Sequence, residues 1–375
     1  MALTKVSTAV VDMSGNTGAL EIAKGATTAA VAPIGTLRAN TTTNKMEVYA
    51  STGWRVLKEG GNAIVIPLTV DYLVVAGGGG GGPGYQAAGG GAGGFRTSFG
   101  TGNINGGLTA VESTLTLAVA TSYSVTIGAP GAGGAGTAMS AGRGATGSSS
   151  FFSDGNTTFE ILTIGGGGGA SYNNYGQGGL SNSGSPGGSG GGAAPYNGAI
   201  GVGNGGSSST YGFNGGNATN YLDPYFGGGG GGAGGVGQVA NGANTGNGGV
   251  GLQSSITGSS TFYAAGGAGG AYYSYLGGPN AAASGIGGSG AAASGARGGP
   301  GFTAPGNGTV NTGSGGGGGG ENGQVGANGG SGVVILRYPG SYAIAKTGSL
   351  ISSTATVGTD YVTTFTSGAG TITFS

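Results

Sequence analysis

The chain has 375 residues, of which 102 are glycine, and its 11 basic and 11 acidic residues cancel to a net charge of zero. Glycine is several times more frequent than usual, and it has no side chain to bury. Because histidine and cysteine are absent, histidine-dependent catalytic triads, imidazole metal ligands, disulfides, thiolate nucleophiles and structural zinc sites are excluded. The scattered, balanced charge argues against binding to nucleic acid or to an anionic membrane.

Targeting signals are also missing from the sequence. The opening residues 1–5 do not begin an apolar core of the kind found in secretory signals. No apolar stretch approaches the roughly 18 to 20 residues that a membrane-spanning helix needs. We therefore expect a soluble, non-secretory chain that is made in the cytoplasm and does not insert into membranes.

Glycine divides the chain into three segments. Residues 1–70 contain 7 glycines, residues 71–330 contain 89, and residues 331–375 contain 6. Charge follows the opposite trend, because 10 of the 22 charged residues lie in the first 60 positions. These contrasts predict a short amino-terminal module, a long glycine-rich domain and a short carboxy-terminal segment.

The amino-terminal segment has the pattern of a small β module. Residues 36–38, 45–49 and 54–57 are predicted to form three short strands, and the residues between them favour turns. Three short strands bury too little apolar surface to be stable alone. We therefore expect residues 1–70 to be ordered by neighbouring copies of the chain or by an assembly to which they attach.

The middle segment opens with a predicted strand, residues 72–76, that leads directly into six glycines at 77–82. Further glycine-dominated runs begin near Gly89, Gly165, Gly187, Gly227, Gly266 and Gly315. Runs of this kind are commonly flexible linkers. A collagen helix is excluded, because glycine does not occupy every third position.

The residues between the glycine runs argue against a flexible linker. Residues 159–164 lead into the run at Gly165, and residues 262–265 lead into the run at Gly266. Between residues 115 and 127, apolar side chains mostly alternate with Thr or Ser, which indicates a half-buried strand or a strand pair. The apolar residues are Leu115, Leu117, Val119, Tyr123, Val125 and Ile127.

Glycine runs can be ordered as extended three-fold helices. Such a helix rises about 3.1 Å per residue, and its N–H and C=O groups all point sideways. Neighbouring helices can pair with these groups and, without Cβ atoms, approach closely enough for Cα–H···O contacts worth ~0.5–1 kcal/mol each. We therefore predict a mostly β and irregular fold with essentially no α-helix. In it, short β modules at both ends flank packed polyglycine-II helices with interspersed strands.

The carboxy-terminal segment returns to ordinary strand patterns. Residues 333–338 form a strongly apolar run that ends at Pro339 and Gly340. Residues 360–366 and 371–374 are joined through a short glycine-containing linker. This arrangement predicts a terminal β-hairpin.

Several segments resemble the glycine-rich domain of bacteriophage tail-fibre and receptor-binding proteins. Residues 70–76 and the six glycines after them look like the start of that domain, and three later segments fit it in the same order. These segments are residues 89–97, 249–270 and 329–338. Residues 35–54 resemble a short β module of phage fibre proteins, in which an aromatic residue often stands at the position of Ala39 here.

The resemblance implies a non-enzymatic virion protein, a tail fibre or fibre-tip adhesin, that binds a bacterial surface glycan or an outer-membrane protein. It further implies a homotrimer that is made in the host cytoplasm, attaches to other virion tail proteins through residues 1–70 and acts outside the host cell. In adhesins of this type, polyglycine helices form a rigid sandwich whose far loops touch the bacterium. The alternative is a purely structural virion component, such as a head fibre, a decoration protein or a fibre shaft.

Tyrosine is the most informative side chain, because 10 of its 17 occurrences fall between Gly165 and Pro279. They form clusters at residues 172–175, 221–226 and 272–275, with Tyr196 and Tyr211 alone. Each cluster lies in a segment that joins glycine runs, where a loop is expected. Tyrosine and asparagine loops on a rigid scaffold resemble antibody contact surfaces. A second role for the same residues is to cover the ends of the glycine helices. The candidate receptor-binding residues are Tyr172, Asn173, Asn174, Tyr175, Tyr196, Tyr211, Tyr221, Asp223, Tyr225, Phe226, Tyr272, Tyr273 and Tyr275.

Catalytic candidates are weaker. Residues 131–136 match the dinucleotide fingerprint GxGxxG, but such matches arise by chance in a glycine-rich chain. Asp154 with Glu160, or Asp223 with Glu321, would provide the two acids of a glycosidase, yet isolated acids are more often turn or surface residues. The four arginines after residue 70 should bond backbone carbonyls or form ion pairs; they are Arg96, Arg143, Arg297 and Arg337. We therefore expect no catalytic residue, no metal site and no cofactor.

Overall fold

The computed structural model divides the chain into two compact units, Met1–Pro67 and Leu68–Ser375. The described residues are 24–25, 36–42, 45–50, 53–56, 58–59, 62–63, 68–100, 104–135, 142–155, 158–171, 173–174, 183–197, 206–218, 225–241, 244–272, 286–288, 303–320 and 324–375. The fold is mostly β and irregular, as predicted, and includes one short 3-10 helix, η1, Gly106–Leu108. In the described part of the chain, no helix is long and apolar enough to cross a membrane.

The first unit contains a small sheet. Strands β2, β3 and β4 confirm the three predicted strands, and β1 adds a parallel edge to β2. The strands are β1 Lys24–Gly25, β2 Leu37–Asn40, β3 Lys45–Ala50 and β4 Gly53–Val56, and a separate pair joins β5 Lys58–Glu59 to β6 Asn62–Ala63.

This small sheet buries an ion pair. Arg38 Nη2 lies 2.7 Å from Glu47 Oε2, and both side chains are more than nine-tenths buried. Asn40 Nδ2 donates to Glu47 Oε1 at 3.0 Å, and the Arg38 guanidinium lies 4.0 Å from the centre of the Trp54 ring. A buried ion pair is a weak source of stability, because removing both charges from water offsets their attraction. That neighbouring copies order this module therefore stays a prediction.

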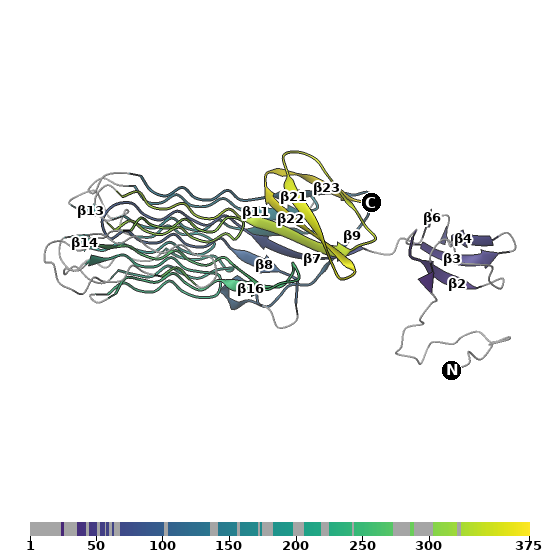
Figure 1. Ribbon diagram of the computed structural model, residues 1–375, viewed down its shortest axis with the longest axis horizontal. Coiled ribbons are helices and arrows are strands. Elements are labelled where there is room, and N and C mark those ends of the chain that lie inside the picture. Colours follow the sequence, from purple (N-terminus) through teal and green to yellow (C-terminus); the bar gives the residue numbers. More distant parts are fainter. Residues whose placement is uncertain are drawn as a thin grey trace, which may run out of the picture. The chain divides into compact units, whose positions relative to one another are not determined.

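The second unit combines two sheets with a bundle of glycine helices (Figure 1). The β7 sheet has the order β21–β22–β19–β7–β8, with β9 also paired to β7, and the β10 sheet has the order β12–β11–β10–β23–β20. The strands of the β7 sheet are β7 Leu68–Val75, β8 Phe95–Thr97, β9 Leu115–Leu117, β19 Val333–Pro339, β21 Ile351–Val357 and β22 Asp360–Ser367. Those of the β10 sheet are β10 Ser122–Thr126, β11 Ser150–Ser153, β12 Glu160–Thr163, β20 Ile344–Lys346 and β23 Ala369–Phe374. Three short strand pairs complete the unit. β13 Asn173–Asn174 pairs with β14 Tyr196–Asn197, and β15 Tyr225–Phe226 pairs with β18 Ala271–Tyr272. β16 Leu252–Ser254 pairs with β17 Thr261–Tyr263.

The two sheets enclose the main hydrophobic core. Val74 from β7 and Leu336 from β19 belong to one buried cluster with Phe152 from β11 and Phe374 from β23. The opposite face of β7 and β19 is buried in a second cluster that includes Leu73, Val75, Phe95, Ile256 and Ile335. β7 and β19 are therefore covered on both faces, which explains why their sequences are nearly continuous apolar runs.

The predicted terminal hairpin is wrong. β22 pairs with β21 and β19 in the β7 sheet, whereas β23 pairs with β10 and β20 in the β10 sheet. The connecting residue, Gly368, has a φ of +92°, which favours glycine and lets the chain turn sharply between the sheets. Phe365 before the crossing and Ile372 after it enter the same core, so burial between the sheets outweighs local pairing. The alternating segment 115–127 is likewise divided, with β9 in one sheet and β10 in the other.

The hydrogen bonds of the run 77–82 confirm the predicted three-fold helix. Gly77 N donates to Ser148 O and Gly80 N donates to Ala145 O, so residues three apart meet the same neighbour. The other donors of this run reach two further neighbours in the same pattern. A repeat of three residues is the period of the polyglycine-II helix.

Six neighbouring segments surround this helix, three accepting from its N–H groups and three donating to its C=O groups. The accepting segments are 88–91, 145–148 and 327–330, and the donating segments are 131–134, 166–169 and 316–319. The runs 87–94 and 227–232 are surrounded in the same way. Backbone groups in the interior of the bundle are therefore paired without forming sheets, as buried polar groups require.

The close approach of these helices excludes side chains from their contacts. A Cβ atom built on Gly81 would overlap the carbonyl oxygen of Gly317, and one built on Gly230 would overlap that of Gly90. Alanine occurs where small side chains meet one another, as in the buried cluster of Ala88, Ala170 and Ala194. Glycine is thus required by packing at these interior positions.

Several glycine helices are direct continuations of strands. β7 runs into the helix 77–82, the helix 87–94 ends in β8, and β12 and β17 lead into the next helices. The sheets therefore cap one end of the bundle, and the helices extend to the opposite end, where β13 and β14 lie (Figure 1). We call this opposite end the distal end; it is formed by residues 83–86, β13, β14, β15, β18, Asn241 and Asn244.

Candidate functional site

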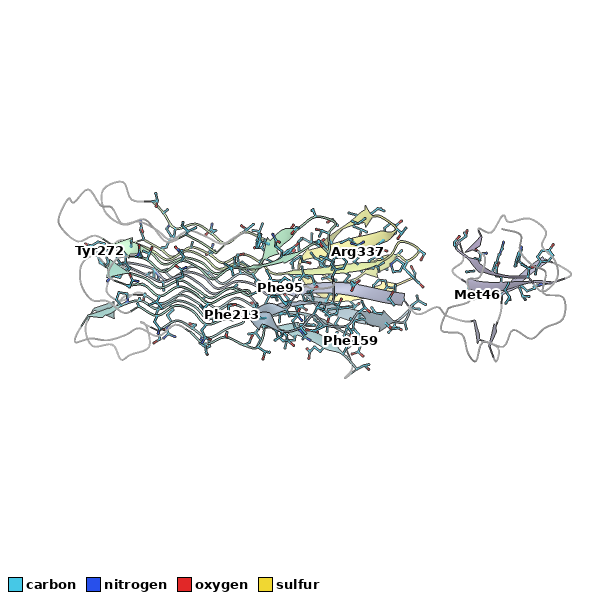
Figure 2. The ribbon with its side chains drawn as sticks, turned by 90° about the horizontal axis from the view of Figure 1, so that it is seen from below. Met46, Phe95, Phe159, Phe213, Tyr272 and Arg337 are labelled. Atoms are coloured by element: carbon cyan, nitrogen blue, oxygen red, sulfur yellow. The ribbon has the colours of Figure 1, made fainter. Side chains whose placement is uncertain are left out.

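The distal end brings together two of the predicted tyrosine clusters. β15 and β18 pair antiparallel, with Tyr225 opposite Tyr272 and Phe226 opposite Ala271. Tyr272 lies at the end of the bundle away from the sheets (Figure 2). The fold therefore places the beginning of one cluster beside the end of another, although the two are far apart in the sequence.

A second strand pair joins further candidates at the same end. β13 and β14 are parallel, with Asn173 opposite Tyr196 and Asn174 opposite Asn197. Their main chains are thus adjacent. Six candidates lie outside the described residues: Tyr172, Tyr175, Tyr221, Asp223, Tyr273 and Tyr275.

Two aromatic side chains at the distal end pack against the bundle. Phe226 is only 3% exposed and belongs to a buried cluster with Ala193, Ala218, Ala240 and Ala271. The Tyr272 ring is half-buried, and its centre lies 4.4 Å from that of Tyr85, at an interplanar angle of 68°. Phe226 thus fills the second predicted role, covering the ends of the helices. Tyr85 was not among the predicted residues, because a single tyrosine after Pro83 and Gly84 carries no cluster signal.

Tyr211 is separate from the distal residues. Its carbonyl oxygen accepts from Phe95 N at 3.4 Å, and its ring lies 4.7 Å from the Arg96 guanidinium. Phe95 begins β8, at the junction between the glycine helices and the sheets (Figure 2). The structure therefore does not bring Tyr211 together with Tyr225 and Tyr272.

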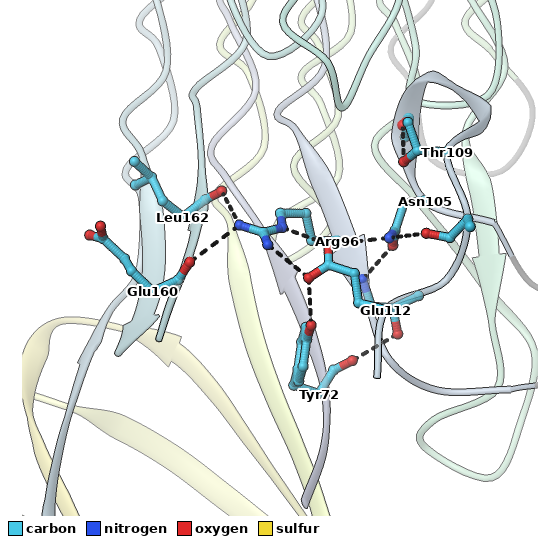
Figure 3. Close-up of polar contacts among 10 residues, drawn as sticks. Tyr72, Arg96, Asn105, Thr109, Glu112, Glu160 and Leu162 are labelled. Atoms are coloured by element: carbon cyan, nitrogen blue, oxygen red, sulfur yellow. Dashed lines mark hydrogen bonds and ion pairs between the residues drawn. The ribbon is translucent and has the colours of Figure 1, made fainter. Parts of the chain in front are cut away.

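Arg96 is the centre of a polar network at this junction (Figure 3). Its Nε and Nη2 each lie 2.7 Å from an oxygen of Glu112, which gives a bidentate ion pair. Its Nη1 donates to the carbonyl oxygens of Leu162 at 3.2 Å and of Glu160 at 3.4 Å. Tyr72 Oη donates to Glu112 at 2.7 Å. The network therefore ties β7 and β8 to β12 and to the segment that carries Glu112.

The electrostatics of the network fit a structural clamp. Burial, and then the hydrogen bond to Glu112, raise the pKa of Tyr72 far above its ordinary value, so its hydroxyl stays protonated. Burial lowers the pKa of Arg96, but the bond to Glu112 and its charge more than compensate, and the net shift is upward. Because every charged group of the network has a partner, the arrangement favours stability.

Comparison with known families finds a match that spans most of the chain. The match to the glycine-rich domain covers residues 59–339, about three quarters of the sequence. The chain belongs to the glycine-rich domain family. The matched region of this glycine-rich protein includes the whole bundle, with β7 and β19, and stops before β20 to β23. No curated protein matches the chain.

The arginines of the glycine-rich protein confirm the prediction at two positions and correct it at a third. Arg96 is ion-paired as described, and Arg337 Nε lies 2.8 Å from Asp360 Oδ2. Arg143 takes part in none of the ion pairs of the described residues, and its buried Nε has no hydrogen-bond partner among them. Burial lowers its pKa. Carbonyl groups of the adjoining helices already accept from glycine N–H groups. Arg297 lies outside the described residues.

The remaining candidates form no catalytic arrangement that the structure describes. Asp154 and Glu160 lie on either side of the β11–β12 turn, and Glu160 is exposed. Asp223 and Glu321 are outside the described residues. The fingerprint segment at 131–134 is a glycine helix bonded alongside 77–82, without the strand–turn–helix context of a dinucleotide site. Among the described residues, no group of three acidic side chains is arranged to hold a metal ion.

Proposed function

We propose that this glycine-rich protein is a non-enzymatic bacteriophage virion component, a tail fibre or fibre-tip adhesin. Its ligand would be a glycan or an outer-membrane protein on the bacterial surface. The observation that carries the proposal is that the Tyr272 ring packs on Tyr85 at one end of a hydrogen-bonded bundle, in a strand pair whose main chain sets Tyr225 opposite Tyr272. A rigid scaffold that presents tyrosines lowers the entropy cost of binding. The resemblance to phage fibre proteins supports the bacterial surface as the target.

The amino-terminal module completes this proposal. Residues 1–70 would attach the chain to other virion tail proteins, and three copies would present three distal ends. Multivalent contact allows weak single sites to give firm attachment. The protein would be made in the host cytoplasm and would act, as part of the virion, outside the cell.

Staining of bacteria tests the proposal. Fluorescently labelled full-length protein should stain some strains of a panel saturably and leave others unstained. The variant with Tyr272, Tyr273 and Tyr275 replaced by Ala should stain at least about tenfold more weakly if the tyrosines bind the receptor. Val310→Ala, at a position 68% exposed outside the distal tyrosines, is the matched control and should stain like the wild type.

Two observations support the alternative of a purely structural virion component. Phe226 is buried among alanines and the Tyr272 ring packs on Tyr85, as expected of aromatic residues that cover helix ends. If folded, oligomeric protein stains no strain, the adhesin proposal is wrong and the structural role is favoured. If it stains but the triple variant stains equally well, attachment does not use this tyrosine cluster.

A further inference from the structure

A groove that includes part of the distal end carries a set of side chains different from the tyrosines. It has a volume of about 300 Å³ and is lined by Gln238, Val239, Asn241, Asn244, Thr245, Asn247 and Ile286. This volume is at the lower end of the range of about 300–1,000 Å³ that is common for small-molecule sites. Four of the seven lining residues carry amides, and none carries a charge.

The groove is built on three neighbouring outer segments of the bundle. Gln238 N donates to Asn247 O at 2.9 Å, and Gly248 N donates to Ile286 O at 3.0 Å. Asn241 and Asn244 exchange backbone hydrogen bonds of 3.1 and 3.0 Å across the turn that joins the first two segments. The walls of the groove are therefore held by the same backbone pairing as the bundle.

The three-residue period of the helix places two of the amides, Asn244 and Asn247, on one face. Asn244, Asn247 and Val250 are three residues apart, and none of them is buried. In an extended three-fold helix such residues share a face and are spaced by about 9 Å. The spacing of Asn244 and Asn247 was therefore a readable signal, although the predicted site was built on the tyrosines alone.

Several of these amides are available to a ligand. Within the described residues, the side chains of Gln238 and Asn244 make no hydrogen bond. Asn247 Oδ1 accepts from Ile286 N at 2.8 Å, which fixes the orientation of its amide and leaves its NH₂ group as a donor. An amide both donates and accepts, as a sugar hydroxyl does. The groove therefore offers both hydrogen-bond donors and hydrogen-bond acceptors to sugar hydroxyls.

Apolar groups complete the groove. Val239 is 46% exposed and Ile286 is 69% exposed, so both present aliphatic surface to solvent at the site. The C–H faces of a pyranose ring pack on surfaces of this kind, while its hydroxyls need hydrogen bonds. An ionic ligand would lose its hydration without meeting an opposite charge.

We infer that this groove binds one or two rings of a neutral saccharide. The inference deepens the proposed function and rests on it for the source of the sugar, a glycan of the bacterial surface. The chemistry of the groove specifies an uncharged, hydroxyl-rich ligand. The groove would select the glycan, and the distal tyrosines would add contact area beside it.

A glycan array tests the groove directly. Full-length protein is applied to immobilised neutral hexose oligosaccharides and to their sulfated and uronic-acid counterparts. We expect binding to a subset of the neutral glycans and weaker binding to the acidic ones. The double variant Gln238→Ala, Asn244→Ala should weaken binding at least about tenfold. Gln253→Ala, at an exposed glutamine on β16, is the matched control and should leave binding unchanged.

Three results would overturn the inference: no glycan binding, binding confined to acidic glycans, or equal binding by the double variant. Equal thermal midpoints for the two variants check that the exposed substitutions leave the fold intact.

Staining of bacteria separates this inference from the proposed function. If wild-type protein and the double variant stain a strain equally, the groove inference is wrong and the proposed function stands. If no strain is stained but array binding depends on the groove, the proposed function is wrong and the groove stands.

Discussion

The second unit contains two regions that reach close packing in opposite ways. One is the bundle of glycine helices, and the other is the pair of sheets, the β7 sheet and the β10 sheet, which we call the sandwich. Between the sheets, the core consists of large side chains such as Phe152, Phe365 and Phe374, and the backbone is paired within each sheet. In the bundle interior, the core is backbone itself, and each inner helix is bonded to neighbours on all sides. One region depends on the side chains that it contains, and the other depends on their absence.

This difference reverses the usual effect of substitution. Removing atoms from the sandwich leaves a cavity, whereas removing atoms from an inner glycine is impossible and adding a methyl group forces helices apart. The two regions also differ in what specifies their structure. The sandwich is specified by the volume and the hydrophobic pattern of its side chains. The bundle is specified by the pairing of each helix with its neighbours.

The largest expected effect is that of a single methyl group in the bundle. A Cβ on Gly81 would overlap Gly317 O on a neighbouring helix, and the neighbours are fixed by hydrogen bonds. We expect Gly81→Ala to lower the free energy of unfolding by about 4 kcal/mol or more, the range of severe single substitutions. Chemical denaturation of the full chain measures this change.

A matched glycine provides the control for that prediction. A Cβ on Gly142 would have no atom of the described residues within 4 Å, and the residue is exposed. Gly142→Ala should therefore change the free energy of unfolding by less than about 0.5 kcal/mol. Equal effects at the two positions would show that the bundle is not packed as tightly as the structure indicates.

The next largest effect is expected from removing a buried side chain between the two sheets. Phe374 is completely buried, and its ring centre lies 5.2 Å from that of Tyr338. Phe374→Ala should lower the free energy of unfolding by about 3–4 kcal/mol through lost burial and the cavity that remains. Ile351→Ala, at a position 61% exposed on β21, is the control and should be nearly neutral. A small loss at Phe374 would mean that the sheets do not depend on this core.

Sequence reasoning predicted local structure better than it predicted neighbours. The strand before the first glycine run and the three-fold helix itself follow from apolar patterning and from the conformational freedom of glycine. The neighbours of the helix 77–82 could not be predicted. Segments such as 145–148 and 327–330 are alike in composition, and no side-chain pattern fixes which helix they pair with or in which register. Only the completed set of donors and acceptors distinguishes one order of helices from another.

The terminal hairpin and the position of Tyr211 depend on the same missing information. The terminal hairpin failed because β22 and β23 each find better partners in a different sheet. Tyr211, a candidate outside the tyrosine clusters, lies beside Arg96, a position that the sequence did not predict. In both cases, tertiary pairing decided between arrangements that are locally equivalent.

The junction between the two regions sharpens the comparison. Arg96 and Glu112 are joined by two bonds of 2.7 Å, with side chains 14% and 22% exposed. Glu112→Gln leaves Arg96 largely buried without a counter-charge, and we expect a loss of about 2 kcal/mol, less than for a fully buried pair. A double-mutant cycle with Arg96→Met measures the coupling. If the two losses simply add, the ion pair does not hold β8 to the segment that carries Glu112.

The smallest expected effect is a pH dependence on β7. Burial raises the pKa of Asp71 above its ordinary value, against the opposing effects of the Ser98 hydroxyl, 2.9 Å away, and the charge of Arg337. The folded state therefore binds this proton more tightly than the unfolded state. The contribution of Asp71 to stability is complete below the unfolded pKa of about 3.9 and is lost as the pH rises through the folded pKa.

Asp71→Asn removes that titration while keeping an oxygen that accepts from Ser98. We expect the variant to gain stability relative to the wild type as the pH rises from about 4, with a constant difference above the folded pKa. Thermal midpoints of both proteins, measured side by side from pH 3 to pH 8, report this difference and cancel the titration of all other groups. A difference that does not change with pH would show that Asp71 titrates alike in both states. It would also mean that a charge on Asp71 costs the folded state no more than it costs the unfolded state.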